Sequence, residues 1–166
     1  DNNVKIIELG VQSMDSEVLR KSGRLYNPET VYSASEIIKE SGITLGHQIM
    51  IGLPGANLEI ELDSISKIKK IKPEFLRIYP IVIIKNTELE NMYYSGDYKP
   101  LRLAEIIDRC VRILEALENS GITIIRIGLH SDIELTASKI INTDSYHQSL
   151  GLLVKSAYIY FKIQKI

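Results

Sequence analysis

The sequence has little of several features that would point away from an ordinary globular domain. One cysteine, Cys110, stands among 166 residues, so no internal disulfide can form and a reducing, cytoplasmic setting is expected. The longest apolar runs have the length of a strand, which excludes a bilayer-spanning helix and a membrane partner. Basic and acidic residues number 20 and 21 and give no overall cationic footprint for nucleic acid.

What is present is the composition of a single folded domain. Hydrophobic residues make up 45% and charged residues 25% of the sequence, which is typical of globular proteins. A domain of this length buries roughly two thirds of its unfolded surface, so we expect one sizeable core. The sequence starts at Asp1 without methionine or an apolar leader, and strand-like residues begin at Val4, which indicates a fragment or a processed chain.

Apolar β-branched runs alternate with amphipathic stretches along the chain. We expect strands at 4–11, 44–51, 75–84 and 123–128, helices at about 27–41, 58–71 and 101–117, and a last helix from about 144. Asn27 followed by Pro28 is a helix start, and Gly42 suits the position just after a helix end. This alternation is typical of a parallel sheet with right-handed crossovers.

Each predicted strand carries polar residues or glycines at alternate positions near its C-terminal end. These positions are Glu8, Gly10 and Gln12, then Gly46, Gln48 and Met50, then Arg77 and Tyr79, and finally Arg126, Gly128 and His130. Strands covered by helices on both faces are apolar on both, whereas these leave one face polar. Because ligands bind at the C-terminal end of an α/β barrel, we expect the polar faces to line one cavity. The alternative is that these groups are hydrogen-bonded parts of an ordinary core.

Patterns for other kinds of catalysis are not found in the sequence. His47, His130 and His147 lack the spacing of metal ligands, and no Ser/His/Asp arrangement can be assembled from the order of residues. We therefore expect no metal ligand in this chain and assign no catalytic residue. The aromatic and basic residues at 155–165 fit a helix core with a charged outer face better than a surface that stacks RNA bases.

Four sequence blocks, each near the end of a predicted strand or in the loop after it, resemble a known superfamily. They are IELGVQS at 7–13, LRKSGR at 19–24, HQIMIGLPG at 47–55 and RIYP at 77–80. In this order they resemble the radical S-adenosylmethionine (radical-SAM) domain of the elongator catalytic subunits and, more distantly, oxygen-independent coproporphyrinogen III oxidase. The resemblance covers about residues 4–129.

The resemblance implies an α/β fold in which residues 1–130 form the C-terminal half of a parallel, TIM-like (β/α) barrel. Residues 131–166 would be a C-terminal extension made of a loop and a helix. In such proteins three cysteines after the first strand hold a [4Fe-4S] cluster. Cys110 alone cannot supply them, so we expect the cluster ligands outside this chain, in an N-terminal half of the same barrel, and Cys110 in the core.

The resemblance also implies a set of residues that bind S-adenosylmethionine. Gln12 matches the position that contacts the ribose, and Arg24 matches the arginine that holds the methionine carboxylate, a pairing that suits a guanidinium. Gln48 stands where coproporphyrinogen oxidase has an aspartate and is a candidate for the ribose or the amino group. Tyr79 and Val82 belong to the segment that packs the adenine.

The implied function is that of part of an iron–sulfur oxidoreductase that cleaves S-adenosylmethionine reductively to start radical chemistry. The piece alone is expected to be inactive, and its substrate stays open between a tRNA base and a tetrapyrrole. Two alternatives remain from the sequence. One is a complete small α/β ligand-binding module with an anion at the turn 52–55. The other is a non-catalytic interaction scaffold that exposes the edge of its first strand to a partner. For the half-barrel, we expect self-association through the exposed first strand.

Overall fold

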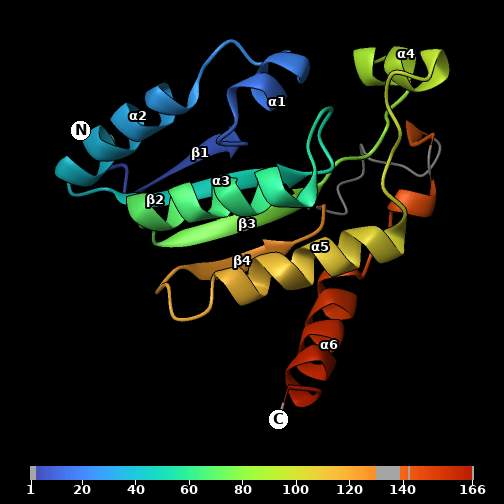
Figure 1. The fold of residues 1–166 in the computed structure, drawn as a ribbon. Helices are drawn as coiled ribbons and strands as arrows, with labels where there is room; N and C mark the ends of the chain where they lie inside the picture. The colour runs from blue at the N-terminus through green and yellow to red at the C-terminus, as the bar shows by residue number, and fades with distance from the viewer. Residues whose placement is uncertain (1–2, 130–138, 142, 166) are drawn as a thin grey trace.

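The computed structural model describes residues 3–129, 139–141 and 143–165, and in them four parallel strands form one sheet (Figure 1). The strands lie in sequence order and are β1 (Ile6–Gln12), β2 (Thr44–Ile51), β3 (Phe75–Pro80) and β4 (Thr123–Ile127). The helices are α1 (Ser16–Lys21), α2 (Pro28–Glu40), α3 (Leu58–Ile71), α4 (Glu88–Ser95), α5 (Leu103–Ala116) and α6 (Leu150–Ile163), with a 3-10 turn η2 (Thr143–Ser145). Among the residues described, no helix is long and apolar enough to cross a membrane.

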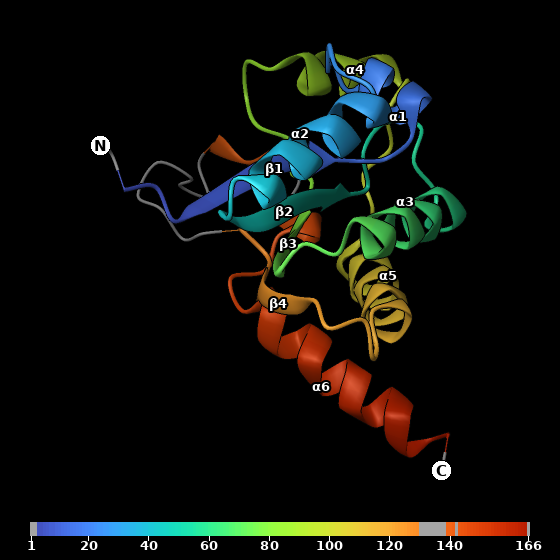
Figure 2. The same cartoon turned by 90° about the vertical axis from the view of Figure 1, so that its left-hand side faces the viewer.

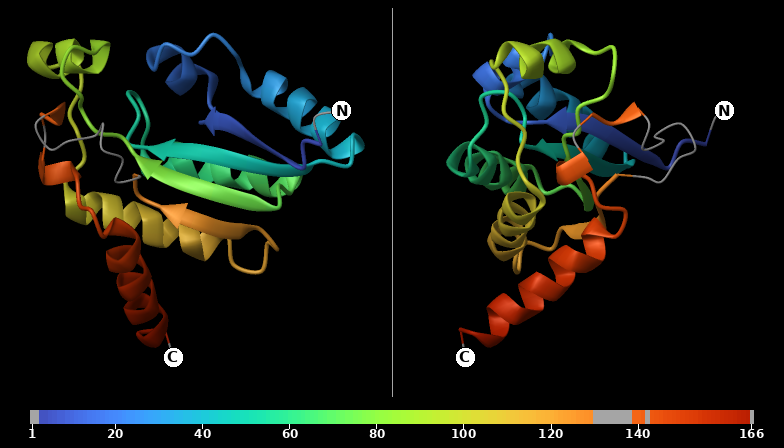
Figure 3. Two further views of the ribbon diagram at one scale, coloured as in Figure 1. Left: turned by 180° about the vertical axis from the view of Figure 1, so that it is seen from behind. Right: turned by 90° about the vertical axis from the view of Figure 1, so that its right-hand side faces the viewer.

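In the described part of the chain, the helices that follow the strands cover only one face of the sheet. Helices α2, α3 and α5 pack on this face, and α6 lies beyond the β4 edge (Figures 1 and 2). The left view of Figure 3 looks onto the other face, where β2, β3 and β4 lie in front of α3 and α5. We call this second face the open face. A parallel sheet with helices on one side only is the arrangement of a partial (β/α) barrel, as predicted.

The hydrophobic core fills the space between the sheet and its helices. Leu45, Ile49 and Ile78 of the strands pack with Ile65 of α3 and Ile113 of α5, and each is at most 4% exposed. Burying one such side chain contributes about 1.5–3 kcal/mol. The core therefore holds the strands in place and leaves their alternate residues on the open face.

Local sequence signals set the ends of the two best predicted helices. The Asn27 side chain accepts a hydrogen bond from the backbone of Thr30 at 3.0 Å, and Gly42 has a φ of 70° just after α2. The Asn57 side chain caps α3 in the same way, through the backbone nitrogen of Ile60 at 2.9 Å. Side-chain caps of this kind satisfy backbone donors that the first helical turn leaves free.

Two predicted boundaries were wrong, and two short helices were missed. Strand β3 ends at Pro80 rather than at 84, because Ile84 forms an antiparallel bridge with Ile140 instead. The last helix begins at Leu150 rather than near 144, where η2 forms a separate turn. Helix α1, capped by the Asp15 side chain, and helix α4 were not predicted. The predicted position of His130 lies outside the described residues.

Helix α6 packs against α5 and β4. Leu150 and Val154 are buried there, and the Phe161 ring lies 5.2 Å from the guanidinium carbon of Arg112. The phenol of Tyr158 donates a hydrogen bond to the carboxylate of Glu118, two residues after the end of α5. The domain boundary after residue 130 stays a prediction.

Candidate functional site

Polar positions of all four strands meet on the open face of the sheet. Gln48 of β2 lies between Gly10 of β1 and Arg77 of β3. Arg77 in turn lies beside Arg126 of β4. The residues flanking Arg77 along its strand are core residues such as Leu76, so alternation along the strand turns Arg77 to the open face.

A carboxylate and a guanidinium form an ion pair across this face. Nε of Arg77 lies 3.2 Å from Oε2 of Glu8, and Nη1 of Arg77 donates a hydrogen bond to the Tyr79 hydroxyl at 3.3 Å. The hydrogen bond with Tyr79 and the charge of Glu8 both raise the pKa of Arg77. The Phe75 ring covers Gly46 so closely that a Cβ there would lie 2.0 Å from it. On the open face, side chains of neighbouring strands thus contact one another directly.

Gln12, the last residue of β1, has a buried side-chain amide whose oxygen receives no hydrogen bond within the described residues. Its side chain is 6% exposed, and no group in the described part of the chain donates a hydrogen bond to its Oε1. Its Nε2 lies 2.9 Å from the place a Cβ on Gly10 would take, so the glycine makes room for the amide on the open face. An unmade hydrogen bond at a buried acceptor costs about 1–3 kcal/mol. Such an atom is a candidate ligand contact.

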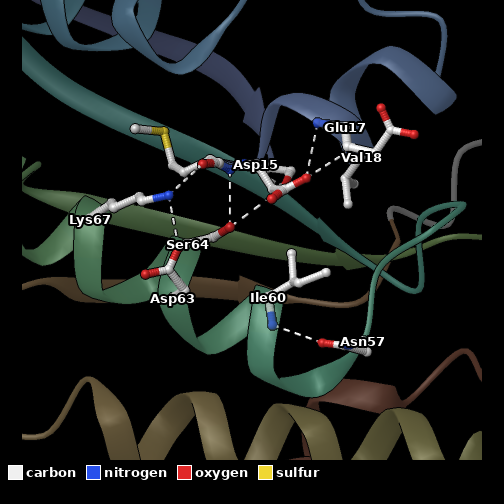
Figure 4. Close-up of polar contacts among 10 residues, drawn as sticks. Asp15, Glu17, Val18, Asn57, Ile60, Asp63, Ser64 and Lys67 are labelled. Atoms are coloured by element: carbon white, nitrogen blue, oxygen red, sulfur yellow. Dashed lines mark hydrogen bonds and ion pairs between the residues drawn. The ribbon is translucent and has the colours of Figure 1, made fainter.

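Helix α3 fixes the turn that follows Gln12 (Figure 4). The Ser64 hydroxyl accepts a hydrogen bond from the backbone nitrogen of Met14 at 3.0 Å, and Lys67 donates one to the Met14 carbonyl at 3.0 Å. Lys67 is held in turn by Asp63 at 2.7 Å. These bonds join β1 to a helix about 50 residues further along the chain, and they set where β1 ends.

A cleft of about 390 Å³ opens beyond the strand ends, between α1 and α4. Its cationic lining includes Arg24, and its apolar lining includes Met50, Ile81 and Val82. The loop that carries Arg24 is tied to β1 by Tyr26, whose hydroxyl donates to the carbonyl of residue 10 at 2.7 Å. Of the five predicted ligand-binding residues, the structure brings Arg24 and Val82 together in this cleft.

The other three predicted residues lie on the sheet rather than in the lining of that cleft. Gln48 and Tyr79 are on the open face, and Gln12 is at the end of β1. Met50 connects the two regions, because it lines the cleft and is also the register neighbour of Tyr79.

The turn after β2 is held by buried side chains that were not predicted from the sequence. Oε1 of Glu61 accepts hydrogen bonds at 2.8 Å from the backbone nitrogen of Gly52 and from Nη1 of Arg109. The Tyr98 hydroxyl donates to the Gly52 carbonyl at 2.7 Å. Burial raises the pKa of Glu61, against the lowering effect of Gly52 and Arg109. A signal existed, because Glu61 shares the buried side of α3 with Ile65.

Two other titratable residues belong to the core. Cys110 is fully buried, and burial raises the pKa of its thiol to about 12, so a thiolate does not form near neutral pH. His47 is also fully buried; its Nε2 lies 3.0 Å from the Ser35 hydroxyl, and burial together with Lys39 lowers the His47 pKa to about 4. Among the residues that the structure describes, no three His, Cys, Asp or Glu side chains could hold a metal ion.

Comparison with known proteins gives relatives that include tRNA uridine(34) acetyltransferases and Elongator complex protein 3. A tRNA uridine(34) acetyltransferase of Methanocaldococcus jannaschii is 34% identical over 105 residues, which are 61% of this chain and 19% of that protein. Elongator complex protein 3 of Homo sapiens is 28% identical over 111 residues, which are 65% of this chain and 20% of that protein. This chain therefore spans about a fifth of the length of these two relatives.

A solved structure and a family model agree with this result. The archaeal Elp3 of Methanocaldococcus infernus, with residues 1–46 deleted, matches 95% of this chain with a TM-score of 0.82 and 28% identity, over 36% of its own chain. Residues 73–156, about half of this chain, match the model of the Radical_SAM C-terminal domain. The chain belongs to this family, within the radical-SAM superfamily, and its sheet is part of a TIM-like barrel of the Elp3 kind.

Proposed function

We propose that this chain forms one side of the S-adenosylmethionine-binding barrel of a radical-SAM enzyme. The observation that carries the proposal is the buried, unpartnered Oε1 of Gln12 at the C-terminal end of β1. A hydroxyl of the ribose would supply the donor that this oxygen lacks, and so remove the cost of an unmade hydrogen bond.

The residues of the cleft and the open face fit the rest of the cofactor. Arg24 is exposed and has no ion pair within the described residues, so its guanidinium is free to bind the methionine carboxylate. Val82 and Met50 offer an apolar wall for the adenine, with Tyr79 beside Met50. Gln48, on the open face, is the residue that we propose for contact with the ribose or the amino group. When bound, S-adenosylmethionine supplies the carbon–sulfur bond whose reductive cleavage starts the radical reaction.

The residues of this chain do not fit a [4Fe-4S] cluster. Its one cysteine, Cys110, lies in the core with a raised thiol pKa. We propose that the cluster ligands belong to an N-terminal half of the same barrel and that this chain alone is inactive. That half would pair with the outer edge of β1, which has no partner strand among the residues that the structure describes. Self-association through this edge and a cytoplasmic setting stay predictions.

The substrate we propose is a tRNA base, because similar proteins include one named for tRNA uridine acetylation. No observation on this chain favours the tetrapyrrole alternative. The polar open face counts against a complete two-sided α/β module, because such a sheet has helices over both faces.

Replacing Gln12 tests the proposal, because the two possible roles of its amide predict opposite results. Gln12→Met keeps an unbranched side chain and removes the unpartnered oxygen. If the amide binds the ribose, the affinity for S-adenosylmethionine should fall about tenfold, while the melting temperature of the free protein should stay the same or rise. The measurements are calorimetry and thermal unfolding on the anaerobically reconstituted full-length protein. Unchanged affinity together with lower stability would show that Gln12 has only a structural role.

A further inference from the structure

Two arginines occupy neighbouring register positions on the open face. Arg77 of β3 and Arg126 of β4 are direct partners, on strands about 4.8 Å apart. On either side of this pair, Leu76 lies beside Ile124 and Ile78 beside Ile127, and all four pack in or against the core. Alternation along β3 turns Arg77 to the open face. On β4 the register shifts by one residue between Ile124 and Arg126, as in a β-bulge, so Ile124 and Ile127 both pack against the core and Arg126, next to Ile127, lies on the same face as Arg77. Like charges in directly opposed positions destabilise a sheet.

A carboxylate compensates only one of these charges. Glu8 lies 3.2 Å from Arg77, but it comes from β1, on the side of Arg77 away from β4. Within the described part of the chain, Arg126 forms no ion pair and no hydrogen bond through its side chain. The pairing of Glu8 with Arg77 thus leaves Arg126 as the uncompensated charge.

The neighbouring strands bring hydrogen-bond donors to the same face as Arg126. The Tyr79 hydroxyl already accepts a hydrogen bond from Arg77, so its own proton is available to another acceptor. Gln48, the register neighbour of Arg77 on β2, adds an amide whose NH2 group can donate. This part of the open face therefore combines positive charge with hydrogen-bond donors, which is the chemistry that recognises an anion.

We infer that Arg126, supported by Arg77 and Tyr79, binds an anionic group of the substrate, a carboxylate or a phosphate, on the open face of the sheet. The inference rests on the proposed function, because closing the barrel over this face lowers the local dielectric. An isolated cation becomes costly in such surroundings unless an anion accompanies it. The planar guanidinium of Arg126 suits either group, since both offer two oxygens to its paired donors.

Protection from an arginine-specific reagent tests this site without an activity assay. The full-length protein is treated with phenylglyoxal in the presence of inorganic phosphate or acetate, and modified peptides are quantified by mass spectrometry. An anion at ten times its dissociation constant should slow modification of Arg126 about tenfold. Arg102, whose side chain is 80% exposed at the start of α5, serves as the unprotected reference. Protection by phosphate alone would indicate a phosphate group, and protection by acetate a carboxylate.

Variants separate the anion site from the cofactor site. In Arg126→Gln, anions should no longer protect Arg77, while affinity for S-adenosylmethionine and the melting temperature should not fall. Arg126→Lys should restore part of the protection. Equal protection of Arg77 in wild type and Arg126→Gln, or no protection of Arg126 by either anion, would overturn the inference. If the wild type does not bind S-adenosylmethionine but anions still protect Arg126, the proposed function is contradicted and the inferred anion site is not.

Discussion

The carboxylate of Glu61 on α3 accepts a hydrogen bond from the backbone amide of Gly52 at 2.8 Å. This bond fixes the turn that forms one wall of the cleft. Gly52 has a φ of 80°, and a Cβ there would lie 3.1 Å from Leu101 and 3.2 Å from Ile81. The turn therefore depends on glycine for its backbone and on Glu61 for its position. Arg109, also at 2.8 Å, compensates the buried charge.

Removing the Glu61 carboxylate should destabilise the protein strongly. Glu61→Ala leaves Arg109 and the Gly52 amide buried without an acceptor, and the free energy of unfolding should fall by about 3–5 kcal/mol. Glu61→Gln keeps an acceptor and should lose less. Urea denaturation measures both. The control is Glu59→Ala, an exposed position on the same helix, which should change stability by less than about 0.5 kcal/mol. Equal effects at the two positions would contradict the role of Glu61.

His47 should make the protein less stable as the pH falls below neutral. Its pKa is about 4 in the folded state, against about 6.5 when unfolded, so the unfolded chain binds the proton more readily. The free energy of unfolding should therefore be highest above pH 6.5 and should fall by about 3 kcal/mol between pH 6.5 and pH 4. In His47→Gln, the free energy of unfolding measured by denaturation should no longer show this decrease with falling pH. In His147→Gln, at an exposed position, it should depend on pH as in the wild type. Parallel curves for wild type and His47→Gln would reject the prediction.

Gly46 should not tolerate a side chain. A Cβ at this position would lie 2.0 Å from the Phe75 ring, so Gly46→Ala should cost about 1–3 kcal/mol of unfolding free energy through overpacking. Replacing the ring as well, in Gly46→Ala with Phe75→Leu, should recover part of the loss. A double-mutant cycle by urea denaturation measures the coupling, and additive effects would show that the ring does not require the glycine.

The elements that could be predicted from the sequence are those fixed by local signals. Strand β2 and helix α3 have the predicted ends, because the alternation of β2 and the Asn57 cap act within a few residues. Strand β3 was predicted to be longer than it is, because the apolar residues up to Ile84 have the composition of a strand. Their partner Ile140 comes 56 residues later (140 minus 84), and no local pattern reveals it.

The same distinction applies to the candidate site. Gln48 and Tyr79 could be placed on one face because the period of a strand decides it. The bond from Tyr26 to β1 and the pair of Glu61 with Arg109, 48 residues apart, depend on how separate elements pack. A charged residue on the apolar side of α3 was the available sign that Glu61 has a buried partner.

Calorimetry of S-adenosylmethionine with the anaerobic, cluster-reconstituted full-length protein tests most directly whether Arg24 holds the methionine carboxylate. Arg24→Ala removes a charged hydrogen-bond pair, worth about 1.5–3 kcal/mol, and should weaken binding about tenfold to a hundredfold. Arg24→Lys should recover only part of the affinity, because a point charge cannot reproduce the guanidinium fork. Arg102→Ala, at an exposed position outside the cleft lining, should bind like the wild type. An Arg24→Ala protein that binds and cleaves S-adenosylmethionine as the wild type does would contradict the assignment.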